Sequence, residues 1–491
     1  MPDSKQASPV QIALGRFWRV RSAQIGVWVV VAFALIGIYA PFLASETALI
    51  WSDAAGLHFP VLGDLFNRLA FPERYDLFFN LLSLTLPLGV LVWVVLRKRF
   101  SIGVLIRYFA VGNVVLWVLL QVPLLSPTVE GGDRRSIWTE RALIGHTYTG
   151  LKQVERLQAG GVAEAAQRRD LLLTTDGELV RVMFKTRKPV ATDGSAILGD
   201  APEDAEKATF IVVQPDGEPD AEPRYMRPDA LQTLGVSFAL FPPISHNHDR
   251  PYPGAVLATP LTTNESTGLK FWLGADAGGQ DILARMCYGA RISLTIGVVA
   301  TVIAMSIGIV IGAISGYFGG WVDILLQRIV EIMMCFPAFL LVLVIVAMVG
   351  RDIMVIMLIF GLTGWAGTAR LVRGEFLSQM GREYVLACQA MGLPRWRIMF
   401  KHILPNALTP LFISAAFSVA GMILSESGLS FLGLVDSRTP SWGLILSAGR
   451  QSPEYAHIIY APGLAIFAMV SALNIIGNGL REAFDPKAAG R

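Results

Sequence analysis

The chain of 491 residues is poor in charge and in cysteine. Only 16% of its residues are charged, whereas about 25% is usual for a soluble protein. Three cysteines are too few for a fold held together by disulfide bonds. The 41 basic and 38 acidic residues leave a net charge of +3, too small to favour nucleic-acid binding. With 53% hydrophobic residues and a mean hydropathy of +0.52, the composition indicates an integral membrane protein.

Motifs for ATP binding and for common hydrolytic chemistry are also missing from the sequence. It contains no GxxxxGK[ST] phosphate-binding loop, no G-x-S-x-G elbow and no H-E-x-x-H pair. We therefore expect a protein that is not an enzyme, with no catalytic residues, no cofactor and no metal of its own. If ATP drives its function, the ATP site must lie on another polypeptide.

Charge-free apolar stretches predict about eight membrane spans, because roughly 20 helical residues cross the hydrocarbon core of a bilayer. These stretches are residues 22–45, 77–96, 108–129, 292–322, 332–350, 353–369, 403–425 and 458–480. The first is too long for the apolar region of a secretory signal and is interpreted as an uncleaved anchor.

Basic residues predict the orientation of these spans. They are concentrated between residues 97 and 107, between 370 and 401, and after 480. Because basic loops stay in the cytoplasm, both termini are expected to be cytoplasmic.

The polar segment of residues 130–270 is then expected outside the cytoplasm as an α+β domain. Alternation predicts strands at 171–186 and 208–217, composition predicts a helix at 151–169, and Pro, Asp and Glu predict loops at 201–227. His246, His248 and Asp249 have ligand-type side chains. However, two histidines at positions i and i+2 suit only a strand or a turn as a metal site, and no further ligand is evident nearby. A solvated loop is therefore favoured over a metal site.

The loop of residues 370–402 carries the most informative pattern. A short helix is expected at 383–391, a turn at Gly392, a second helix opened by Pro394, and a span begun or kinked by Pro405. Such an arrangement in a cytoplasmic loop favours a compact platform for a soluble partner over an ordinary basic loop.

Two further features lie within the spans. Gly308, Gly312 and Gly316 line one helix face and should allow another helix to approach closely. Glu426 lies near the outer end of its span, where it could contact substrate or be a capped or interfacial acid.

Ordered motifs across residues 271–486 resemble those of the inner-membrane permease subunits of binding-protein-dependent ABC importers. More narrowly, they resemble the dipeptide and oligopeptide permeases. The matching segments are FWLGADAGGQDILARMCYGARISLTIG (271–297), GYFGGWVD (316–323), REYVLACQAMG (382–392), HILPN (402–406), LSFLGL (429–434), PSWG (440–443) and LREAFDP (480–486).

This resemblance implies an all-α polytopic protein with the type I importer fold in a bacterial-type inner membrane. It implies that the cytoplasmic loop docks into an ATPase as a coupling helix. The positions carried over as coupling residues are Glu383, Leu386, Ala387, Cys388, Gly392 and Arg395. The chain departs from the family pattern in having Leu-Ala-Cys for Glu-Ala-Ala at 386–388, and Gln280 where Arg is usual.

Four regions follow from this comparison. They are residues 1–45 with the first span, an inserted segment 46–129 with two extra spans, the extracytoplasmic domain 130–270, and a permease core 271–491 with five spans and the coupling loop 370–402.

The function implied is import of peptides or similar solutes by alternating access. The expected partners are a second permease, two ATPase subunits that bind ATP and Mg²⁺, an external substrate-binding protein and membrane lipid, but no nucleic acid. An ATP-independent channel or secondary carrier, and a membrane-anchored sensor or enzyme, are the alternatives. The substrate-binding residues stay unknown.

Overall fold

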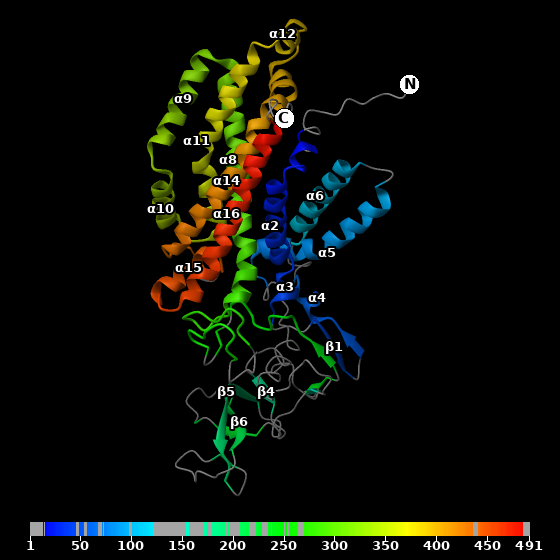
Figure 1. Cartoon of the computed structure of the whole chain (residues 1–491), viewed down its shortest axis with the longest axis vertical. Coiled ribbons are helices and arrows are strands. Elements are labelled where there is room, and N and C mark those ends of the chain that lie inside the picture. The colour runs from blue at the N-terminus through cyan, green and yellow to red at the C-terminus, as the bar shows by residue number, and fades with distance from the viewer. Residues whose placement is uncertain are drawn as a thin grey trace. The chain divides into compact units, whose positions relative to one another are not determined.

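The computed structural model describes residues 15–45, 49–66, 71–97, 101–121, 238–263, 270–435 and 440–484, apart from short gaps at 54–55, 72, 237, 250 and 253–254. Between 121 and 238 it describes mainly short strands. The chain divides into two compact units, whose helices and strands are labelled in Figure 1. Unit 1 comprises Met1–Leu35, Gly289–Gln451 and Ile459–Arg491, and unit 2 comprises Ile36–Tyr288 and Ser452–Ile458.

Unit 1 is built from helices. Its long elements are α2 (Arg21–Ile38), α8 (Ile282–Phe318), α11 (Ile353–Met380), α14 (Leu404–Phe431) and α16 (Ala456–Phe484), of which α2, α8 and α16 extend into unit 2. The shorter helices are α9 (Gly320–Cys335), α10 (Ala338–Val349), α12 (Glu383–Ala390), α13 (Arg395–Arg397), the π-helix η3 (Ile398–Ile403) and α15 (Trp442–Gln451).

Seven helical segments among the described residues are long and apolar enough to cross a membrane. An eighth span is obtained if α9 and α10 count as one broken span, because they are bent by 80°. The expected span at 332–350 falls on this bent pair, with its first residues in α9 and the others in α10. Pro337 explains the bend, since it forces Phe336 out of the helical conformation, to φ −83° and ψ 132°.

The shortest predicted span, 353–369, continues as one helix of 28 residues to Met380. Arg370 ends the apolar run but not the helix. As a result, α11 extends about 16 Å beyond residue 369 at 1.5 Å per residue.

Glycines bring the unit 1 helices into close contact, as the small-residue pattern predicts. A Cβ at Gly308 would lie 2.6 Å from Thr368 Cβ, and a Cβ at Gly316 would lie 2.6 Å from Phe376 Cβ. Helices α8 and α11 therefore pack with almost no side chain between them.

The described residues of unit 2 form a helical hairpin and three small sheets. Helices α5 (Arg74–Leu96) and α6 (Ile102–Leu119) pack through Gly89, which lies against the Phe109 ring, and a 2.7 Å hydrogen bond from Thr85 Oγ1 to Asn113 Oδ1. Two short helices, α3 (Ala40–Leu43) and α4 (Pro60–Asp64), accompany them.

The largest sheet is antiparallel, in the order β4 (Leu171–Leu173), β5 (Leu179–Pro189), β6 (Lys207–Pro215), β7 (Arg224–Met226). It confirms the expected strands. The remaining sheets pair β1 (Ile50–Asp53) with β2 (Gly56–His58) and β9 (Phe238–Leu240), and β3 (Val154–Arg156) with β8 (Leu234–Val236).

Two sequence expectations fail in this region. Residues 154–156 of the expected helix 151–169 form strand β3, whose partner across the sheet is distant in sequence, and the other residues lie outside the described part. The expected loop 201–227 contains β7 as well as the expected strand β6, because β7 forms backbone hydrogen bonds with β6.

Candidate functional site

Helix α12 and the turn that follows it form the centre of the candidate site. Met391 ends the helix, and Gly392 has φ +70°. The Leu393 N–H donates to the Cys388 carbonyl (3.2 Å), and the Gly392 N–H donates to the Gln389 carbonyl (2.9 Å). This is the Schellman arrangement, which favours glycine at the left-handed position. The predicted helix and its turn at Gly392 are confirmed.

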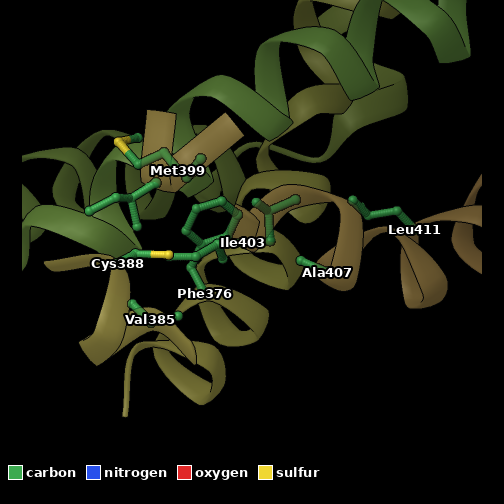
Figure 2. Packing of buried hydrophobic residues seen from close by; sticks show 10 residues of the cluster. Phe376, Val385, Cys388, Met399, Ile403, Ala407 and Leu411 are labelled. Atoms are coloured by element: carbon green, nitrogen blue, oxygen red, sulfur yellow. The ribbon is translucent and has the colours of Figure 1, made fainter. Parts of the chain in front are cut away.

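One face of α12 is packed into a hydrophobic cluster. Val385 (0% exposed) and Cys388 (6% exposed) lie three residues apart on that face. They join Phe376 of α11, Met399 and Ile403 of η3, and Ala407 and Leu411 of α14 (Figure 2). Ala313 of α8, Val372 of α11 and Ile398 of η3 complete the buried set. We call α12, its turn and α13 the platform.

Three large apolar side chains of the platform are exposed. Leu386 is 52% exposed, Met391 69% and Trp396 59%. Glu383 and Ala387 are exposed beside them. Contiguous exposed apolar groups mark interaction sites, so these side chains are candidates for contact with a partner.

Two long helices connect the platform to the membrane-spanning part. Helix α11 enters it from one side. On the other side, α13, η3 and α14 run continuously from Arg395 to Phe431. Pro394 precedes α13 as predicted, with φ −62° and ψ 140°. The Leu404 N–H donates to the Met399 carbonyl, five residues back, so a π-turn precedes Pro405 rather than a break.

The structure brings all six candidate coupling residues into this platform but divides them between its faces. Glu383, Leu386, Ala387, Gly392 and Arg395 are exposed, whereas Cys388 lies in the hydrophobic cluster. The Arg395 guanidinium lies over the Phe318 ring of α8, at 5.7 Å from its centroid. Sequence reasoning missed Met391 and Trp396, although two large apolar residues in a basic loop were a usable signal.

The histidine segment in unit 2 differs from the solvated loop that the sequence favoured. His246 is 1% exposed and stacks on Phe271, with ring centroids 4.3 Å apart. Its Nδ1 lies 2.9 Å from Asp281 Oδ2, while Asp281 Oδ1 accepts from the Ala284 N–H at the start of α8. Burial between an aromatic ring and a helix-capping carboxylate therefore replaces solvation.

No group of three or more potential metal-ligating side chains occurs among the described residues. His248 stacks on Tyr288, with centroids 3.8 Å apart. The backbone carbonyl of Asp249 accepts a hydrogen bond from Gln280 Nε2 at 2.8 Å.

Gln280, the departure from the family pattern, takes part in a local network. Its Oε1 accepts from Arg285 at 2.5 Å, and Arg285 also pairs with Asp276. Asp276 Oδ1 in turn accepts from the backbone N–H groups of Gly278 and Gln280. Gln280 thus ties the residues before α8 to Asp249.

Glu426 is fully buried in α14. Its Oε1 accepts a 2.6 Å hydrogen bond from Ser430, whose hydroxyl also lies 3.2 Å from that of Ser441. Ser441 accepts from the Leu444 N–H at the start of α15. The capped-acid interpretation of Glu426 is the one that this geometry favours.

The glycine-packed spans and the bent helix pair are those of a polytopic membrane protein, and the platform is an exposed element on it. The family of binding-protein-dependent transport system inner membrane components matches residues 308–490. This match includes α9 to α16 and hence the whole platform.

Curated relatives agree with this match. The chain is 41% identical over 218 residues to an oligopeptide transport system permease protein of Haemophilus influenzae, covering 44% of this chain and 70% of the relative. It is 38% identical over 230 residues to a dipeptide transport system permease protein of Alkalihalophilus pseudofirmus (46% and 76%). It is 36% identical over 226 residues to a glutathione transport system permease protein of Pectobacterium atrosepticum (46% and 75%).

The chain belongs to the family of binding-protein-dependent transport system inner membrane components. It is a permease subunit of an ABC importer.

Proposed function

We propose that this permease subunit imports peptides or similar small solutes, and that its platform receives the force of a partner ATPase. The observation that carries the docking role is the division of α12 between a buried face and an exposed face. Val385 and Cys388 fix the helix to its support, which leaves Leu386 available to a partner. Met391 and Trp396 of the platform are exposed as well.

In this proposal, ATP and Mg²⁺ bind to the partner ATPase subunits, not to this chain. ATP-driven closure of two ATPases displaces α12. Because the hydrophobic cluster joins α12 to α11 and to the helix that runs from Arg395 to Phe431, the displacement reaches both. Protein interiors are close-packed and transmit such movements as shifts of whole elements. The paired permeases then change between inward and outward openings.

The expected orientation follows from this role. Platform and termini would lie in the cytoplasm, since the basic residues are concentrated there, and the chain would lie in a bacterial-type inner membrane. Residues 46–129 would be an inserted hairpin of spans, and residues 130–270 an extracytoplasmic α+β domain. The hairpin α5–α6 and the sheet β4–β7 support an insertion, because both precede residues 308–490, the part of the chain that the family matches.

The proposed cargo rests on the relatives. Their names refer to oligopeptide, dipeptide and glutathione transport, and all three substrates are peptides. A second permease, two ATPases and an external binding protein would complete the transporter. Affinity would then come mainly from the binding protein.

A cross-linking experiment tests the docking surface. Cys335 is exposed, whereas Cys287 and Cys388 are buried, so Cys335→Ser provides a background with little reactive thiol. In it, Leu386→Cys should give a product with an ATPase subunit when membranes are treated with a short thiol-to-amine reagent. Met348→Cys is the matched control, because Met348 is 82% exposed but lies on α10, outside the platform.

The proposal predicts a cross-linked ATPase from position 386 and none from position 348. Equal yields from both positions would contradict a specific docking surface. No product from position 386, in membranes where the ATPase is present and transport proceeds, would contradict it as well.

A further inference from the structure

An ion pair joins α11 to the corner between α8 and α9. The Arg373 guanidinium binds the Asp323 carboxylate with both ends: Nε lies 2.6 Å from Oδ1, and a terminal nitrogen lies 2.7 Å from Oδ2. The two side chains are 30% and 17% exposed. Such a two-point contact fixes orientation as well as distance.

Neighbouring polar groups complete this contact. The Ser315 hydroxyl of α8 donates to Asp323 Oδ1 at 2.5 Å, and Gln327 Nε2 of α9 donates to the Ser315 hydroxyl at 3.1 Å. Three helices thus meet at one carboxylate: α8 through Ser315, α9 through Asp323 and α11 through Arg373.

Backbone contact also holds the α8–α9 corner close to α11. Gly319 and Gly320 both have positive φ (60° and 52°), so α8 turns sharply into α9. On the other side of the pair, a Cβ at Gly316 would meet the Arg373 carbonyl at 2.9 Å. The corner is therefore held against α11 by backbone contact and by charge.

Arg373 also lies next to the platform along α11. Phe376, three residues further on, is 0% exposed and belongs to the hydrophobic cluster under α12. Residues three apart lie on the same side of a helix. A displacement of the platform that moves Phe376 consequently moves Arg373.

We propose that Asp323 and Arg373 are positioning residues that carry movement of the platform into the α8–α9 corner. This inference rests on the proposed function, because it assumes that an ATPase displaces α12. Without the pair, the backbone contact at Gly316 would still hold α8 against α11, but Asp323 of α9 would no longer be tied to α11 and α9 would follow the platform less closely. ATP hydrolysis would then no longer respond to the loaded binding protein.

The test measures basal and binding-protein-stimulated ATP hydrolysis of the assembled, purified transporter in lipid vesicles. Asp323→Asn keeps the size of the side chain and removes its charge. Glu331→Gln is the matched control, because Glu331 makes a 2.6 Å pair with Arg328 on the same helix, but the two side chains are 49% and 71% exposed.

We expect Asp323→Asn to lower the stimulated rate about tenfold, within the range of energies that couple contacting residues. The basal rate and the amount of assembled protein should stay unchanged. Glu331→Gln should change neither rate, since exposed pairs contribute little. The double variant Asp323→Arg and Arg373→Asp exchanges the two charges. It should recover much of the stimulation that either single change removes.

A stimulated rate that survives in Asp323→Asn would overturn the inference. So would an equal fall of the basal rate, the stimulated rate and the amount of protein, since that pattern indicates a purely structural pair. If the wild-type chain itself assembles with no ATPase, the proposed function fails. That result differs from a failure of the inference, in which the wild-type transporter assembles and responds to the binding protein but Asp323→Asn has no specific effect.

Discussion

Gly392 offers a prediction whose size follows from the backbone. The residue has φ +70°, and a Cβ built there would meet nothing within 4 Å. A substitution therefore causes no clash, and its cost is that of placing an L side chain in the left-handed region, about 1–2 kcal/mol. That energy corresponds to a factor of about 5–30 in an equilibrium.

Gly392→Ala should therefore reduce the population of the turn that presents α12, and binding-protein-stimulated ATP hydrolysis should fall by up to that factor. Gly392→Asn should lose less, because Asn tolerates the left-handed conformation. Gly392→Trp adds bulk beside the exposed apolar side chains and should abolish the stimulation while the chain still inserts into the membrane.

Gly381 is the matched control in the same loop. It also has open space around it, but its φ is −84°, so Gly381→Ala should have almost no effect. The assay is ATP hydrolysis by the purified transporter at saturating binding protein. Equal rates for the alanine variants at 381 and 392 would refute the assignment of a required left-handed turn.

Three further predictions concern the platform and its support. Phe376→Ala should lower the stability of the chain by about 3–5 kcal/mol, because it empties the core of the hydrophobic cluster; thermal unfolding in detergent measures this. Leu386→Asp should leave that unfolding temperature unchanged, since the side chain is 52% exposed, yet it should prevent the ATPase from co-purifying. Gly312→Val should disrupt assembly, because a Cβ at Gly312 would collide with the α11 backbone. Gly367→Val should not, because a Cβ at Gly367 would have no neighbouring atom within 4 Å. The yield of intact protein after gel filtration measures both effects.

The local structure of the platform could be predicted because its decisive residues act through their own backbone. Gly392 permits a positive φ, and the ring of Pro394 fixes the φ of that residue, whatever side chains pack around them. The apolar runs likewise predicted the long helices. Arg370 misled the prediction of one span, because charge ends an apolar run without ending a helix.

Other features depend on partners distant in sequence. The burial of Cys388 depends on Met399 and Ile403 packing against α12. His246 looked solvated because neither Phe271 nor Asp281 lies near it in the sequence. Pro337 indicates the bend before α10. The spans were predicted from stretches without charge, and that criterion takes no account of proline. The pairing of Asp323 with Arg373 spans 50 residues and follows only from how α8, α9 and α11 pack.

The most direct test of the account is purification of the tagged chain from its native membrane in mild detergent, followed by identification of its partners and an ATPase assay. The account predicts that a second permease and ATPase subunits co-purify and that a peptide-loaded binding protein raises ATP hydrolysis. A chain that purifies alone and moves solute across vesicles without ATP would contradict it.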